Sequence, residues 1–123
     1  MKGVAFGFFF LGILAVILGM LWGIQMSASA DHTLAPAHAH LNLIGWVTFG
    51  LMGLYYHLMP SAADTRLART HLLLAVVGLV LIVPGIVLAI NEVTEAAAIA
   101  GSFVTLAAML VFAVVVWRGR AAV

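Results

Sequence analysis

Long apolar runs alternate with short polar connections along the chain. Four runs are visible, at about residues 4–24, 41–59, 72–90 and 96–117. Each is about 20 residues long, enough for a helix to cross a hydrocarbon layer of roughly 30 Å. None shows the two-residue alternation of a transmembrane barrel strand, so the pattern predicts helices.

The predicted fold is an all-α integral membrane protein with four transmembrane helices. We expect these helices at about residues 4–25, 37–59, 67–90 and 95–117, within a single domain over residues 1–123. The composition agrees, because 66% of the residues are hydrophobic and only 7% are charged, whereas about a quarter are charged in soluble domains. The first run is longer than the roughly 7–15 apolar residues of a secretory signal peptide, so we expect a retained span.

Charged residues divide the ends of these helices into two groups. All five Lys and Arg residues fall on one side of the four-helix arrangement: Lys2, Arg66, Arg69, Arg118 and Arg120. Connections on the other side carry acidic residues: Asp31, Glu92 and Glu95. The positive-inside rule then places both termini and residues 60–70 in the cytoplasm.

This topology predicts a multi-pass protein of a bacterial-type inner (plasma) membrane, with the lipid bilayer as a partner. The basic residues all flank spans, so the sequence indicates no nucleic-acid surface. Asp64 or Thr65 is a candidate cap for the third helix, and Pro60 a natural end for the second.

The five histidines fall into two groups that the topology separates. His38 and His40 open the second run, with His32 in the preceding connection, and all three lie on the predicted outer (periplasmic) side. His57 lies about 25 Å further along the helix than His40, at roughly 1.5 Å per residue. We expect His57 and His71 to lie near headgroups at the cytoplasmic interface, and the tyrosines at 55 and 56 to form part of an aromatic belt.

The pair His38 and His40 is the strongest candidate for chemistry. On a helix, two residues at roughly 100° each point about 200° apart, so both cannot chelate one ion from a single helix. A neutral imidazole is a good ligand for haem iron, and an apolar slot suits a porphyrin. The leading interpretation is therefore a haem site that includes Asn42 and Trp46. A copper, zinc or iron site formed with His32 is an alternative, as is a pair without a ligand.

The chain contains no cysteine. This excludes thiolate metal sites, disulfides and covalent haem attachment through a C-x-x-C-H motif.

The second run also carries a family resemblance. Residues 37–60 read AHAHLNLIGWVTFGLMGLYYHLMP. This stretch resembles the haem-holding helices in subunit I of the haem-copper oxidase superfamily, which includes the nitric oxide reductases. There an H-x-H motif serves two haems from opposite faces of one helix, and some members have a Gly-Trp shortly after it, as Gly45-Trp46 follows here.

The resemblance implies an architecture and a cofactor. The family subunit has three arcs of four helices, and this chain resembles one arc. It therefore implies a homotrimer with haem b between protomers, His40 as the favoured axial ligand and His38 as a second ligand, with an unknown redox partner.

The chain also departs from the family. The last two runs have no outer histidine for a second catalytic metal, and the spans lack the interior ionisable residues of a proton pump. We therefore expect electron transfer or haem sensing rather than catalysis. A metal-binding protein, or a cofactor-free structural protein with an oxidase-like fold, remains the alternative.

Overall fold

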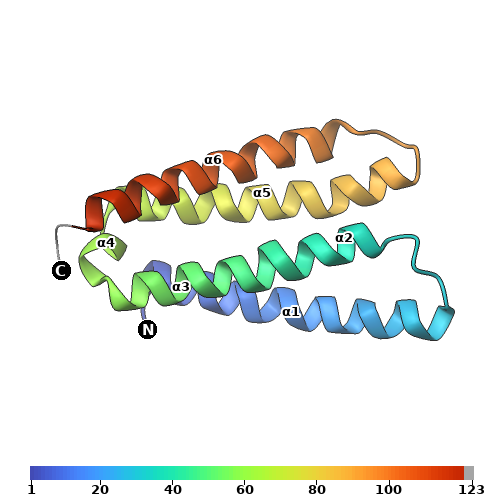
Figure 1. The fold of residues 1–123 in the computed structure, drawn as a ribbon, viewed down its shortest axis with the longest axis horizontal. Helices are drawn as coiled ribbons and strands as arrows, with labels where there is room; N and C mark the ends of the chain where they lie inside the picture. Colours follow the sequence, from blue (N-terminus) through green and yellow to red (C-terminus); the bar gives the residue numbers. More distant parts are fainter. Residues whose placement is uncertain (121–123) are drawn as a thin grey trace.

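The protein forms two helical hairpins that lie side by side (Figure 1). The structure, a computed structural model, describes residues 1–120, in which every regular element is helical. In chain order the elements are α1 (Gly3–Ser29), α2 (Ala35–His40), the π-helix η1 (Leu41–Thr48), α3 (Phe49–Leu58), α4 (Pro60–Ala63), α5 (Arg66–Ile90) and α6 (Ala96–Gly119).

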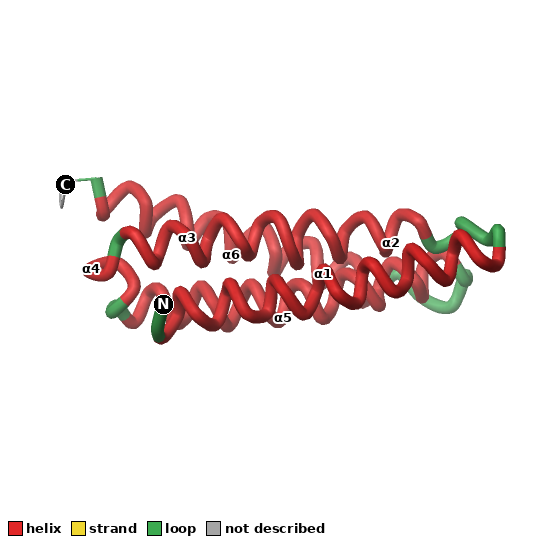
Figure 2. The backbone as a smooth tube through the Cα atoms, turned by 90° about the horizontal axis from the view of Figure 1, so that it is seen from below, coloured by secondary structure: helices red, strands yellow, loops and turns green. Residues whose placement is uncertain are grey.

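Elements α2, η1 and α3 follow one another without a break, and we call residues 35–58 the second arm. The first hairpin consists of α1 and the second arm, and the second hairpin of α5 and α6. Short α4 joins the two hairpins. Seen after a 90° turn, the long elements run nearly parallel and the connections gather at the two ends of the bundle (Figure 2).

Three helices, α1, α5 and α6, are long and apolar enough to cross a membrane. Their outward faces carry large apolar side chains: Leu18 is 58% exposed, Leu73 65% and Phe103 70%. Exposed apolar surface on this scale marks a contact with lipid or with other proteins. The described residues therefore form an all-helical bundle with three helices that can span a membrane.

Most helix ends lie within two residues of the predicted ones, but α1 continues to Ser29, four residues beyond its predicted end at 25. Thr65 caps α5, because its Oγ1 accepts a hydrogen bond from the backbone N–H of Ala68 at 3.1 Å. The second arm ends at Leu58, and Pro60 begins α4, where its missing N–H costs nothing.

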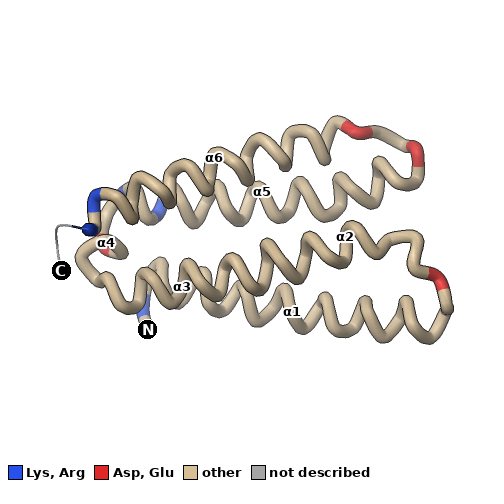
Figure 3. Tube along the Cα trace, in the orientation of Figure 1, with Lys and Arg blue, Asp and Glu red and all other residues tan. Residues whose placement is uncertain are grey.

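Charge is sorted along the bundle (Figure 3). One end, here called the basic end, carries Lys2, Arg66, Arg69, Arg118 and Arg120, and also Asp64. The other end, here called the acidic end, carries Asp31, Glu92 and Glu95. Residue 1 and residue 120 both lie at the basic end (Figure 1).

Glycines allow the helices within each hairpin to approach closely. A Cβ atom on Gly101 of α6 would lie 2.5 Å from the backbone nitrogen of Ile82 in α5. In the first hairpin, a Cβ on Gly45 would lie 2.7 Å from the Cβ of Ala15. Small residues at such contacts are a common means of packing membrane helices.

Candidate functional site

His40 is the last residue of α2, near the acidic end. Its Nδ1 lies 2.8 Å from the carbonyl oxygen of Pro36, one turn earlier. A carbonyl oxygen only accepts hydrogen bonds, so Nδ1 carries the proton and donates it. In a neutral imidazole this leaves Nε2 with a free lone pair, the arrangement in which metal-ligating histidines are usually held. The side chain is partly exposed.

His38 lies against α1. Its ring makes an edge contact with the ring of Trp22, with 6.1 Å between centroids. It also fills the space beside Gly23, where an added Cβ would lie 3.3 Å from the His38 Cε1. His38 and His40 therefore have separate surroundings, as their two-residue spacing predicts.

Asn42 and Trp46 follow His38 at intervals of four residues and also pack on α1. The Asn42 amide donates a hydrogen bond to the His38 carbonyl at 2.9 Å, and its Oδ1 occupies the place where a side chain on Gly19 would project. The Trp46 ring lies 6.2 Å from that of Phe9, between centroids. Of the predicted cofactor residues, the structure thus groups His38, Asn42 and Trp46 on the α1 side and leaves His40 apart from them.

His32 is exposed in the connection between α1 and α2. Beside it, Asp31 accepts hydrogen bonds from the Thr33 hydroxyl at 2.6 Å and from the Thr33 backbone N–H at 3.0 Å. These bonds, the hydroxyl first, lower the pKa of Asp31. Within residues 1–120, no three His, Cys, Asp or Glu side chains are close enough to hold a metal ion. The structure therefore does not assemble the predicted site of His32, His38 and His40.

Directly after His40 the backbone changes from an α-helix to the π-helix η1. The hydroxyl of Thr48 donates to the carbonyl of Leu43, five residues earlier, at 2.9 Å. π-helical turns are rare and occur frequently at functional sites. This one contains Asn42 and Trp46, so it sets how the α1-facing side chains are oriented relative to the α2 histidines.

A second polar site lies nearer the basic end, inside the core. His71 has no exposed surface and Tyr56 is 1% exposed. The Tyr56 Oη lies 2.9 Å from the His71 Nδ1. The His71 ring lies between those of Phe8 and Phe112, with centroids 4.7 and 5.0 Å away. Its Nε2 has no hydrogen-bond partner in the described part of the chain.

The predictions that His71 lies near headgroups and that Tyr56 belongs to an aromatic belt were therefore wrong, whereas His57 is exposed. The expectation that the spans lack interior ionisable residues was wrong for the same reason. The available signal was a histidine inside an apolar helix, which in membrane proteins is a default functional candidate.

Comparisons of the chain with protein-family models, with curated proteins and with solved structures found no match. The function is therefore argued from the site itself.

Proposed function

We propose that this chain is a membrane haem b-binding protein that serves in electron transfer or haem sensing, with His40 as an axial ligand. One observation supports this most directly. The bond between the His40 Nδ1 and the Pro36 carbonyl fixes the tautomer in which Nε2 is the free ligand atom.

The surroundings of His40 suit an apolar macrocycle with a polar edge. Leu43 and Val47, which follow in η1, are 61% and 46% exposed. Their side chains would contact the porphyrin face, and the nearby polar connection around Asp31 leaves its carboxylate edge in water. When bound, haem b supplies a one-electron iron couple. The protein side chains orient it and exclude water.

The second axial ligand and the oligomer belong to the same proposal. His38 of a neighbouring copy would reach a shared haem only after its ring leaves the space beside Gly23. A homotrimer that closes as a ring would place His40 at each interface between copies.

We further propose that the second arm is a fourth span. The charge segregation would then place the basic end in the cytoplasm and His40 toward the outer side of a bacterial-type inner membrane.

The test is the visible spectrum of the protein purified in detergent, before and after addition of haemin. We expect a Soret band that His40→Ala abolishes. His57→Ala is the matched control, because His57 is an exposed histidine at the opposite end, and it should leave the band unchanged.

A protein that stays colourless after addition of haemin would overturn the proposal and favour a cofactor-free structural role. An unchanged band in His40→Ala would overturn the assignment of the ligand. Native mass measurements that show only monomers would overturn the trimer alone.

A further inference from the structure

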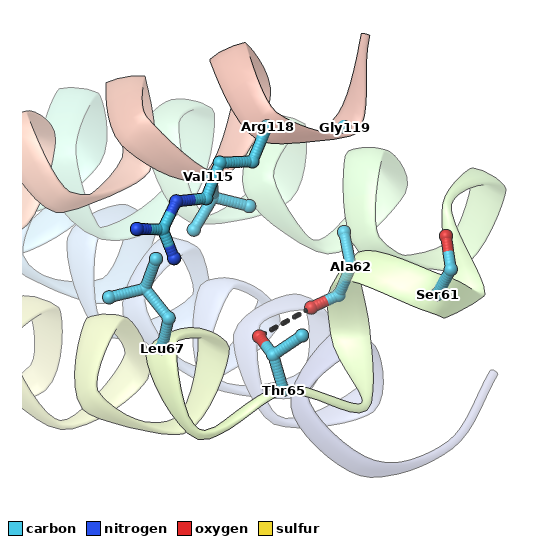
Figure 4. A pocket seen from close by; sticks show the side chains of 7 residues that line it. All are labelled: Ser61, Ala62, Thr65, Leu67, Val115, Arg118 and Gly119. Carbon is cyan, nitrogen blue, oxygen red and sulfur yellow. Dashed lines mark hydrogen bonds between the residues drawn. The ribbon is translucent and has the colours of Figure 1, made fainter. Parts of the chain in front are cut away.

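A cavity of about 160 Å³ lies at the basic end, between α4, the start of α5 and the end of α6 (Figure 4). Its lining includes Ser61 from α4, Thr65 and Leu67 at the start of α5, and Arg118 and Gly119 from α6. It lies at the opposite end of the bundle from His40, so it is separate from the proposed haem site.

Arg118 supplies the charge in this cavity. Its side chain extends from α6 toward the start of α5 (Figure 4), and Arg118 and Leu67 both line the cavity. A guanidinium presents a planar set of N–H donors that matches the oxygens of a phosphate. The Thr65 hydroxyl already donates to the Ala62 carbonyl at 2.8 Å, so it holds the turn together.

The rest of the lining is mostly aliphatic. Ala62, Leu67 and Val115 form walls that a free, fully hydrated anion would not favour. An arginine beside an apolar wall instead suits a molecule with a charged head joined to an apolar body.

The position of the cavity along the bundle also suits a molecule with a charged head and an apolar body. The membrane-capable helices α1 and α5 begin at this end and α6 ends here. In a bilayer, the basic end would therefore lie at the level of the lipid headgroups. Among residues 1–120, five basic side chains and one acidic side chain, that of Asp64, lie there. Basic pockets between membrane helices at this level bind anionic headgroups.

We propose that this cavity binds the phosphate of an anionic lipid headgroup, with Arg118 as the charged donor. The proposal does not depend on haem binding.

The test measures lipid binding to the full chain in a neutral detergent by native mass spectrometry. Phosphatidylglycerol is the probe, with phosphatidylcholine and inorganic phosphate as the comparison ligands. Arg118→Gln should weaken phosphatidylglycerol binding about tenfold, as expected for the loss of a charge-assisted contact. Arg118→Lys should weaken it less, because the charge remains and the planar donor pair is lost.

Arg120→Gln is the matched control. Arg120 lies two residues away, but its guanidinium lies 3.7 Å from the ring centroid of Trp117 rather than in the cavity. Equal losses in Arg118→Gln and Arg120→Gln would overturn the proposal, because diffuse charge would then explain the binding. Equal binding of phosphatidylcholine would overturn it as well. Displacement of phosphatidylglycerol by millimolar inorganic phosphate would show that the site takes a free anion and would overturn the lipid assignment.

Discussion

The hydrogen bond between Tyr56 and His71 joins the second arm to α5 inside the core, and Tyr56→Phe removes it with almost no change in volume. A buried hydrogen bond between neutral groups contributes about 0.5–1.5 kcal/mol, and a donor or acceptor left without a partner costs about 1–3 kcal/mol. Couplings between membrane helices measured in double-mutant cycles average about 0.6 and reach about 1.7 kcal/mol.

The Nε2 of His71 already has no partner among the described residues, so Tyr56→Phe leaves both ring nitrogens unpaired. We expect Tyr56→Phe to lower the free energy of unfolding by about 1–2 kcal/mol.

His71→Phe tests the other partner. The new phenylalanine ring would lie between the rings of Phe8 and Phe112 and would carry no unpaired nitrogen. His71→Phe leaves the hydroxyl of Tyr56 without this partner, but it also removes the Nε2 that already has none among the described residues. We therefore expect His71→Phe to cost less than Tyr56→Phe, and the double variant to be more stable than the sum of the two changes predicts.

The assay is reversible unfolding in mixed micelles with increasing SDS, followed by tryptophan fluorescence and far-UV circular dichroism. Two results together would refute the reasoning. One is a Tyr56→Phe variant with the stability of the parent protein, and the other is a double variant whose loss equals the sum of the single losses.

Two further predictions concern other parts of the chain. Gly45→Ala should destabilise the protein by about 1–3 kcal/mol, because the added Cβ would lie 2.7 Å from that of Ala15. Gly50→Ala has no atom within 4 Å of the added Cβ, so it should be neutral or stabilising by up to about 1 kcal/mol in the same unfolding assay. Equal effects of the two changes would contradict the packing. Thr33→Val should raise the pKa of Asp31 toward its usual 3.8, followed by NMR titration of the carboxyl carbon. Because the pKa of Asp31 is lower in the folded state, its contribution to folding stability is present above pH 3.8 and is lost as the pH falls through the folded-state pKa. An unchanged titration in Thr33→Val would exclude the Thr33 hydroxyl as the cause.

The approximate extents of the helices could be predicted from local features of the sequence. The apolar runs give the lengths, and the threonine at 65 caps α5 through its own hydroxyl. The separate surroundings of His38 and His40 also follow from local geometry, since residues two apart on an α-helix are separated by about 200°.

The rotation of each helix could not be predicted in the same way. In a soluble protein the apolar face of a helix is the buried face, but in a bilayer both the lipid and the core accept apolar side chains. The sequence after His71 is apolar, but Arg69 and Thr70 directly precede it, and this pattern favours the headgroup level. The burial of His71 depends instead on its contacts with Phe8 and Phe112, which are distant in the sequence. The π-helix η1 added to the difficulty, because its wider turns change the faces on which residues after His40 lie.

Residues 1 and 120 both lie at the basic end, because the long helical segments form an even number of passes along the bundle. A connector from residue 120 of one copy to residue 1 of the next would therefore stay at one end of the bundle. Tandem fusion of this unit would keep every copy in the same orientation. A longer chain of repeated bundles could thus arise by gene duplication without an added reversing helix.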